Sequence, residues 1–202
     1  GARIGPYCVI KGKSVIRAGA EIGAHCELYS SVVESGVKIK ASVAESALIG
    51  RNAEIGPYAH LREGARIGAG AKIGDYVEIK NSRIGAGTKV CHLAYVGDAD
   101  IGEGCNIGAG VVFANYDGAV KRRTVVGKNV FVGSNSTLVA PLDIGSGAFV
   151  AAGSVITGDV PERALAICRG TTTIKENWQN NAYTNAAKNK TAAQESGADG
   201  GA

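Results

Sequence analysis

The chain has 202 residues, a length that favours one main domain because a single core can absorb most of it. With 30 glycines, 45% hydrophobic residues and only 5% aromatic residues, it is too apolar for disorder and too poor in aromatics for an ordinary globular core. The formal net charge is +4 and the basic residues are scattered, which does not indicate a nucleic-acid partner.

The sequence contains no run of 18 apolar residues and no signal-peptide pattern, so we expect no membrane partner. Its five cysteines are unequally spaced and form no CxxC pair. This spacing argues against a disulfide framework or a zinc knuckle and fits a reducing, cytoplasmic location. The absence of Met and a start already inside a repeat suggest a piece of a longer protein.

Aliphatic residues recur every six positions along most of the chain. The first series runs from Ile4 to Leu28, the second from Ile55 to Ile79, and the last from Val126 to Ile156. Gly follows the aliphatic residue in 12 of 22 such units, and the fifth residue of a unit is usually small. This pattern is the hexapeptide repeat of a parallel β-helix.

Each unit predicts a short strand, and three units close one triangular coil of about 18 residues. The sequence therefore predicts an all-β fold, a parallel β-helix over residues 1–161 with roughly nine coils spaced about 4.8 Å apart. Within it, residues 33–54 are irregular, and the five-residue units 79–83 and 96–100 shorten one coil to 17 residues.

The longest interruption is the thirteen-residue stretch Phe113–Val125, which we expect to leave the β-helix as a loop. After Pro161 the repeat ends, and a C-terminal extension is expected over residues 162–190. Its segment Thr173–Lys188 has a helix-forming composition. Residues 191–202 read as a disordered tail rich in Gly, Ala and Ser.

Cysteine and histidine give little support for a metal site. Three cysteines occupy the fifth, inward position, where small core residues are expected; they are Cys8, Cys26 and Cys105. The three histidines, His25, His60 and His92, occupy different positions of their units, so they should not converge on one zinc ion. Cys91 and His92 are adjacent on a strand and should not act as a pair.

The residues around His92 form the strongest candidate for chemistry. With a 17-residue coil, Asp75, His92 and Ala109 should stack, as should Glu78 and Tyr95. An imidazole is the natural general base near neutral pH, and Glu78 could fix its tautomer. Positive charge suited to a phosphate comes from Arg62, Lys80 and Lys121, although such residues on a β-helix can also be its solvated face.

Two stretches resemble one family closely. They are VEIKNSRIGAGTKVCHLAYVGDADIGEGCNIGAG (Val77–Gly110) and NYDGAVKRRTVVG (Asn115–Gly127). They resemble the C-terminal acetyltransferase domain of GlmU, the bifunctional glucosamine-1-phosphate N-acetyltransferase/uridylyltransferase of UDP-N-acetylglucosamine synthesis. The resemblance covers about residues 1–178 and implies left-handed winding of the β-helix.

The resemblance also implies roles for particular residues. His92 would be the base that deprotonates the amine of glucosamine-1-phosphate for attack on acetyl-CoA. The sugar phosphate would be bound by Arg62, Lys80 and Lys121, and the sugar by Tyr95, Asn106 and Asn115. Acetyl-CoA would lie near Ala109, Tyr116, Ser134, Ala152 and Arg169, whose amides and hydroxyl could polarise the thioester.

No metal is expected for this domain, and the resemblance implies a homotrimer with shared active sites, to which Trp178 could contribute. The chain departs from the family in two ways. The uridylyltransferase domain is absent, and the usual LRPGA stretch has Glu63 in place of Pro. Two alternatives remain: a hexapeptide acyltransferase with another amino-sugar acceptor, or a non-catalytic trimerisation scaffold, which would not bind acetyl-CoA. An ice-binding β-helix is disfavoured because no Thr-x-Thr ladder recurs.

Overall fold

The computed structural model describes residues 1–176, and the chain divides into two units, Gly1–Arg169 and Gly170–Ala202. The first unit is built from 27 short strands, all of them parallel to their neighbours. No helix occurs among the described residues, and none of their segments is long and apolar enough to cross a membrane as a helix.

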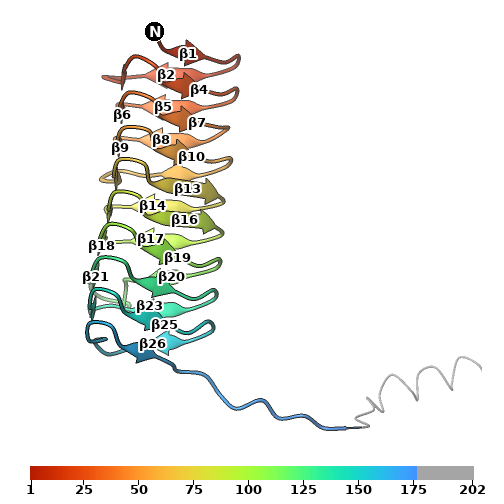
Figure 1. Ribbon diagram of the computed structural model, residues 1–202. Helices are drawn as coiled ribbons and strands as arrows, with labels where there is room; N and C mark the ends of the chain where they lie inside the picture. The colour runs from red at the N-terminus through yellow and green to blue at the C-terminus, as the bar shows by residue number, and fades with distance from the viewer. Residues whose placement is uncertain (177–202) are drawn as a thin grey trace, which may run out of the picture. The chain divides into compact units, whose positions relative to one another are not determined.

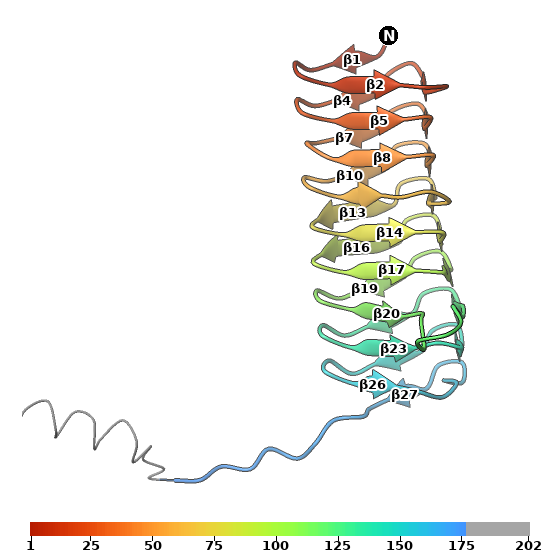
Figure 2. The same ribbon diagram turned by 180° about the vertical axis from the view of Figure 1, so that it is seen from behind.

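The strands form three sheets, each built from every third strand, except that β27 follows β25 at the end of the ten-stranded sheet (Figures 1 and 2). The ten-stranded sheet contains β1 (Arg3–Ile4), β4 (Glu21–Ile22), β7 (Lys38–Ile39), β10 (Glu54–Ile55), β13 (Lys72–Asp75), β16 (Lys89–His92), β19 (Asn106–Ile107), β22 (Phe131–Val132), β25 (Phe149–Val150) and β27 (Leu165–Ala166). The nine-stranded sheet contains β2 (Val9–Lys11), β5 (Glu27–Tyr29), β8 (Val43–Glu45), β11 (His60–Leu61), β14 (Glu78–Lys80), β17 (Tyr95–Gly97), β20 (Val112–Ala114), β23 (Thr137–Val139) and β26 (Val155–Ile156). The eight-stranded sheet contains β3 (Val15–Ile16), β6 (Val32–Val33), β9 (Leu48–Ile49), β12 (Arg66–Ile67), β15 (Arg83–Ile84), β18 (Ala99–Ile101), β21 (Thr124–Val126) and β24 (Leu142–Ile144).

The coils of this unit wind left-handed. In Figure 1 the strands of the ten-stranded sheet lie in front and run to the right, whereas Figure 2 shows the nine-stranded sheet in front when the molecule is seen from behind. Followed from the N-terminus, the chain turns anticlockwise as it moves away. This hand is opposite to that of ordinary parallel crossovers and agrees with the expectation from the family resemblance.

The core is a stack of aliphatic residues at the predicted inward positions. Ile55 pairs with Ile73 and Leu61 with Ile79 on successive coils, and all four are buried. Phe113 is the largest fully buried side chain and lies just before the long loop. Cys26 and Cys105 are buried as expected, and burial raises the pKa of both thiols. Cys8 is only partly buried.

The corners between sheets set the close spacing of the coils. At Gly68, an added Cβ would lie 2.6 Å from Ala86 N and 2.7 Å from Gly85 C, both backbone atoms of the next coil. Other corners need a left-handed backbone, which Gly, Asn and a few larger residues supply; Tyr58 and Tyr76, for example, have φ of 58° and 54°. The repeat of Gly after the aliphatic residue thus reflects backbone contact between coils.

Two stretches differ from the sequence-based expectation. The irregular residues 33–54 still form strands in register, because Lys38–Ile39 pairs with both Glu21–Ile22 and Glu54–Ile55. The β-helix also continues beyond Pro161, since β27 pairs with β25. The periodicity missed β27 because the preceding unit is short: buried Val160 follows Ile156 after only four residues.

Within the predicted Phe113–Val125 stretch, residues 115–123 leave the β-helix as a loop between β20 and β21, while both ends of the stretch are paired in these strands. Residues 173–176 are not helical, and the remainder of the expected helix, the tail 191–202 and Trp178 lie outside the described residues.

Candidate active site

His92 is the last residue of β16, an inner strand of the ten-stranded sheet, and is exposed to solvent. Its Nδ1 lies 2.6 Å from Asp75 Oδ1, directly one coil before, where β13 pairs with β16 in register. The pKa of Asp75 lies below its ordinary value because the carboxylate accepts hydrogen bonds from its own backbone amide and from His92. With Nδ1 engaged by this carboxylate, Nε2 is left to take up a proton.

The expected role of Glu78 in orienting His92 is wrong within this chain. Glu78 Oε1 accepts a hydrogen bond from Arg62 Nη1 at 2.7 Å, and the pKa of Arg62 is raised by this contact. Glu78 begins β14, one corner beyond Asp75, so it lies on the nine-stranded sheet, whereas Asp75 stacks directly beneath His92. The predicted pairing of Glu78 with Tyr95 is confirmed.

A second group of candidate residues lies at the C-terminal ends of the strands of the nine-stranded sheet, away from the corner that follows His92. Lys80 ends β14, and the approach of Lys121 from the long loop lowers the pKa of Lys80. Both lysines line a cavity of about 380 Å³, whose other lining residues are Glu63, Gly64, Asn81 and Asp98. The structure thus brings the two lysines together on a surface that also presents Arg62, which directly follows β11 of the nine-stranded sheet.

Tyr95 and Asn115 meet across Gly97. A Cβ at Gly97 would contact the Tyr95 hydroxyl and would lie 2.8 Å from Asn115 Nδ2, so this glycine leaves room for both side chains. Asn115 is 8% exposed and donates a hydrogen bond to Asp98. Asn106 lies apart from them, on β19 of the ten-stranded sheet beside Lys89 and Phe131.

The residues expected near acetyl-CoA form a column that continues from His92. Strand register stacks one residue from each of five successive coils, at or just beyond the C-terminal ends of the strands of the ten-stranded sheet. These residues are Asp75, His92, Ala109, Ser134 and Ala152. The side chains of Ala109, Ser134 and Ala152 are small, and Ser134 and Ala152 are exposed.

Some backbone amides of this column are free to donate hydrogen bonds. The contacts between successive coils are made by the next residue along the chain: Gly110 N donates to His92 O at 3.2 Å, and Gly153 N donates to Ser134 O at 2.8 Å. The amides of Ala109, Ser134 and Ala152 have no hydrogen-bond partner within residues 1–176. A polar ligand with carbonyl groups could therefore lie along this edge.

Of the two remaining residues expected near acetyl-CoA, Arg169 lies beside the column, whereas Tyr116 lies away from it in the loop between β20 and β21. Arg169 Nη1 donates to Ala152 O at 3.2 Å, which ties it to the last residue of the column. Tyr116 is exposed in the long loop, where its hydroxyl donates to Gly118 O.

The histidines do not converge on a metal. His60 Nε2 lies 3.0 Å from Glu45 Oε2, and His25 stacks on Tyr7, so each histidine has separate neighbours. Over residues 1–176, no group of three His, Cys, Asp or Glu side chains could hold a metal ion.

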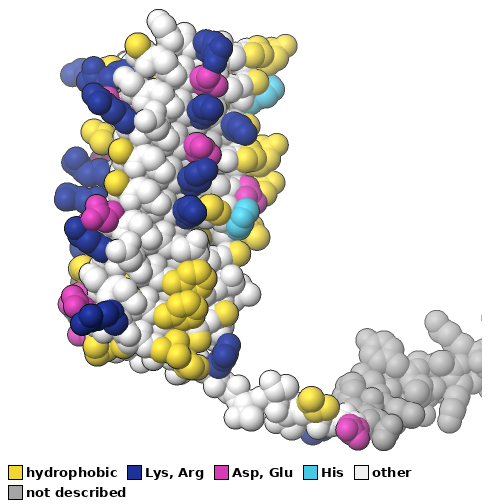
Figure 3. Space-filling view, viewed as in Figure 1, with side chains coloured by type: hydrophobic (Ala, Val, Ile, Leu, Met, Phe, Trp, Pro, Cys, Tyr) yellow, Lys and Arg dark blue, Asp and Glu magenta, His cyan; other side chains and the backbone are white. Residues whose placement is uncertain are grey.

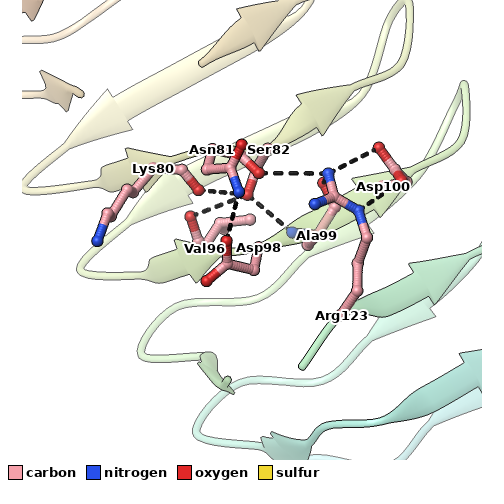
Figure 4. A network of polar contacts seen from close by, with 8 residues as sticks. All are labelled: Lys80, Asn81, Ser82, Val96, Asp98, Ala99, Asp100 and Arg123. Atoms are coloured by element: carbon pink, nitrogen blue, oxygen red, sulfur yellow. Dashed lines mark hydrogen bonds and ion pairs between the residues drawn. The ribbon is translucent and has the colours of Figure 1, made fainter. Parts of the chain in front are cut away.

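Sequence reasoning missed two carboxylates as partners: Asp75 for His92, and Asp98 for Asn115. The coil length that stacked Asp75 under His92 also stacks Asn81 under Asp98, 17 residues later. Figure 4 shows this second network, in which Asp98, Asn81 and Arg123 converge from three segments of the chain. The 17-residue coil length therefore already stacked each of these pairs, but the sequence did not show which carboxylate would bind the neighbouring side chain.

Comparison with known proteins places these features in a family. Residues 43–140 match the family described as the GMPPB C-terminal domain, and residues 123–158 match the bacterial transferase hexapeptide family. The chain is 50% identical over 171 residues to the bifunctional protein GlmU of Nitratidesulfovibrio vulgaris, and 51% identical over 173 residues to that of Thermoanaerobacter pseudethanolicus. These matches cover 84% and 86% of the chain and 38% of each relative, so the chain spans well under half of the length of these proteins.

Among solved structures, a mutant of the GDP-perosamine N-acetyl transferase from Caulobacter crescentus, in complex with CoA and GDP-perosamine, matches at 25% identity. The TM-score is 0.45, and the match covers 62% of this chain and 52% of that one. The sequence matches to GlmU, together with the hexapeptide family match and the parallel β-helix, show that the chain belongs to the GlmU family of hexapeptide-repeat proteins.

Proposed function

We propose that this chain transfers the acetyl group of acetyl-CoA to the amine of glucosamine-1-phosphate, giving N-acetylglucosamine-1-phosphate for UDP-N-acetylglucosamine synthesis. The observation that carries the proposal is the His92–Asp75 pair at the head of the column of Ala109, Ser134 and Ala152. A base and a row of free backbone donors on one edge are what an acyl transfer needs. Because acetyl-CoA is a cytoplasmic metabolite, we place the reaction in the cytoplasm.

In this mechanism, His92 removes a proton from the sugar ammonium or from the attacking amine, and Asp75 stabilises the imidazolium that forms. The amine nitrogen forms a bond to the acetyl carbonyl carbon, the carbon–sulfur bond breaks, and coenzyme A leaves as the thiol. The amide of Ala109 or Ser134, or the Ser134 hydroxyl, would stabilise the negative charge that develops on the carbonyl oxygen. Tyr116, Ala152 and Arg169 would contact the rest of acetyl-CoA.

The phosphate of the acceptor would bind beside Lys80 and Lys121. The mutual repulsion that lowers the pKa of Lys80 would be relieved by a dianion between the two lysines. Arg62 would add a planar donor for the same group. Tyr95, Asn106 and Asn115 would contact the sugar.

We further propose a homotrimer. Asn106 lies on the ten-stranded sheet, whereas Lys80 and Tyr95 lie on the nine-stranded sheet of the same chain. A single acceptor would contact all of them most simply at an interface, where a neighbouring chain completes the site.

The proposal predicts the acceptor preference. Thiol release from acetyl-CoA should be measured with glucosamine-1-phosphate, glucosamine-6-phosphate and free glucosamine side by side. We expect turnover with the 1-phosphate alone, because Lys80 and Lys121 are fixed where the strands of the nine-stranded sheet end, whereas His92 ends β16 of the ten-stranded sheet, near the corner where those strands begin. Equal turnover with free glucosamine would contradict a phosphate site, and turnover with none of the three would contradict the proposed reaction.

A further inference from the structure

The long loop between β20 and β21 is anchored to the β-helix at both of its ends. It carries Asn115 and Lys121, which the proposed function places against the acceptor. We propose that Asp98 and Arg123 are positioning residues that fix this loop over the acceptor site. The inference rests on the proposed function, and it concerns two residues that would not themselves contact the substrate.

Asp98 is the anchor at the start of the loop. It is 8% exposed, and its two carboxylate oxygens accept hydrogen bonds from the side-chain amides of Asn81 and Asn115. Its backbone also holds the far end of the loop, because Thr124 N donates to Asp98 O at 3.2 Å. A buried carboxylate with both oxygens engaged by amides has little freedom to move, so it fixes the orientation of Asn115.

Arg123 is the anchor at the end of the loop. Its guanidinium donates to both carboxylate oxygens of Asp100, Nε to Oδ2 at 2.7 Å and Nη2 to Oδ1 at 3.1 Å. Nη2 also lies 3.2 Å from Asn81 O, as Figure 4 shows. The proximity of Arg123 lowers the pKa of Asp100, which agrees with a persistent ion pair.

The two anchors meet at Asn81, the residue directly after Lys80. Asp98 holds the Asn81 side chain and Arg123 contacts the Asn81 carbonyl. Between the anchors, the loop closes on itself, since Arg122 N donates to Asn115 O at 2.8 Å and Tyr116 pairs with Lys121. The position of Lys121 relative to Lys80 therefore depends on both anchors.

Electrostatics alone predicts the opposite effect of removing Asp98. The carboxylate lines the same cavity as Lys80 and Lys121, where a negative charge would repel a phosphate. If Asp98 acted only through its charge, Asp98→Asn should lower the KM for the acceptor. If Asp98 acts through Asn115, the KM should rise instead. An asparagine at position 98 has only one side-chain oxygen, so it cannot accept the hydrogen bonds of both Asn81 and Asn115 in the same way.

The test compares the steady-state constants of Asp98→Asn and Arg123→Lys with those of the wild type. We expect the KM for glucosamine-1-phosphate to rise by about tenfold in each, while the KM for acetyl-CoA stays within about twofold. Arg122→Gln is the matched control: the side chain of this neighbouring arginine forms a 3.5 Å ion pair with Asp117 and contacts neither Asp98 nor Asp100, and the variant keeps the backbone amide, so it should retain both constants. A lower acceptor KM in Asp98→Asn, or an equal rise in the Arg122 control, would overturn the proposal.

A double variant tests whether Asp98 acts through Asn115. Asp98→Asn combined with Asn115→Ala should raise the acceptor KM no further than Asn115→Ala alone, and additive effects would contradict this route.

Amide hydrogen exchange of residues 115–123, measured without substrate, separates this inference from the proposed function. Exchange should accelerate in Arg123→Lys and not in Arg122→Gln. If the wild type acetylates no amino sugar, the proposed function fails while the exchange result still reports on the anchors. Unchanged exchange in an active enzyme would refute the anchors alone. Arg123 is exposed, so its variant should fold even if the buried Asp98 variant does not.

Discussion

His92 and Asp75 are held together by the regular stacking of coils and not by a dedicated loop. Each ends a strand of the ten-stranded sheet, and the parallel register sets their separation. The pair is solvent-exposed in a single chain, with His92 60% and Asp75 36% exposed at the side chain. Its value for catalysis therefore lies in orientation, since a solvated ion pair contributes little to stability.

We expect His92→Ala to reduce kcat for acetyl transfer by about 10²–10⁴-fold, because it removes the proposed general base. The change should leave the melting temperature almost unchanged, since the side chain is exposed. Thiol release and thermal unfolding of the same preparation check both expectations. Turnover near the wild-type rate would remove His92 from the mechanism.

Asp75→Asn should have a smaller effect. The asparagine oxygen can still accept a hydrogen bond from Nδ1 of His92, but the negative charge that stabilises the imidazolium is lost. Because hydrogen bonds from its own backbone amide and from His92 keep the pKa of Asp75 below its ordinary value, this charge is present throughout the neutral range. We expect a loss in kcat of about 10–100-fold, whereas Glu78→Gln, which leaves the Asp75 contact intact, should keep the imidazole oriented. A larger loss in Glu78→Gln would restore the original assignment of the orienting carboxylate.

The repeating unit of this fold is a short strand followed by a corner, and glycine at the corners allows successive coils to approach closely. Gly68→Ala should lower the free energy of unfolding by about 1–3 kcal/mol, because the new Cβ would collide with the backbone of the next coil. Gly158→Ala is the matched control, since its Cβ would meet no atom within 4 Å. Chemical denaturation of both variants measures the difference. Equal stability would show that the coils can separate without cost.

The strands and corners could be predicted from the sequence because the same position of each six-residue unit is buried and the same backbone turn recurs. Ile73, Ile79 and Ile84 are buried where the six-residue pattern placed them. The last strand, Leu165–Ala166, was missed because a short unit precedes it and breaks the count. The pairing of His92 with Asp75 over Glu78 was also missed, because the choice depends on which corner each carboxylate lies beside.

The outer surface of the first unit changes character along its length. On the outer face of the ten-stranded sheet, Figure 3 shows a row of charged side chains, which alternate in sign from Arg3 to Lys72. Further along the same sheet, Phe131 and Phe149 stack with their ring centres 4.6 Å apart. A second apolar feature, which we call the corner ridge, follows the left-handed corner residues Tyr7, Tyr58, Tyr76 and Leu93. Their exposures of 79%, 59%, 59% and 64% are high for such large apolar groups.

The corner ridge is suited to contact a neighbouring chain, because Leu93 directly follows His92 and a subunit covering the ridge would enclose the base. Tyr58→Lys should therefore weaken the proposed trimer, since it would place a charge in an apolar contact. Sedimentation should show a smaller species, and acetyl transfer should fall at the concentrations where the variant dissociates.

Val125→Lys provides the control for this variant. Val125 is also exposed, but it lies on the eight-stranded sheet between Asp100 and Asp143, where a lysine has carboxylates beside it. It should keep the wild-type mass and rate. If Tyr58→Lys sediments like the wild type, the ridge lies outside the interface. If Tyr58→Lys is monomeric and fully active, one chain alone carries the complete site, and the shared-site arrangement is wrong.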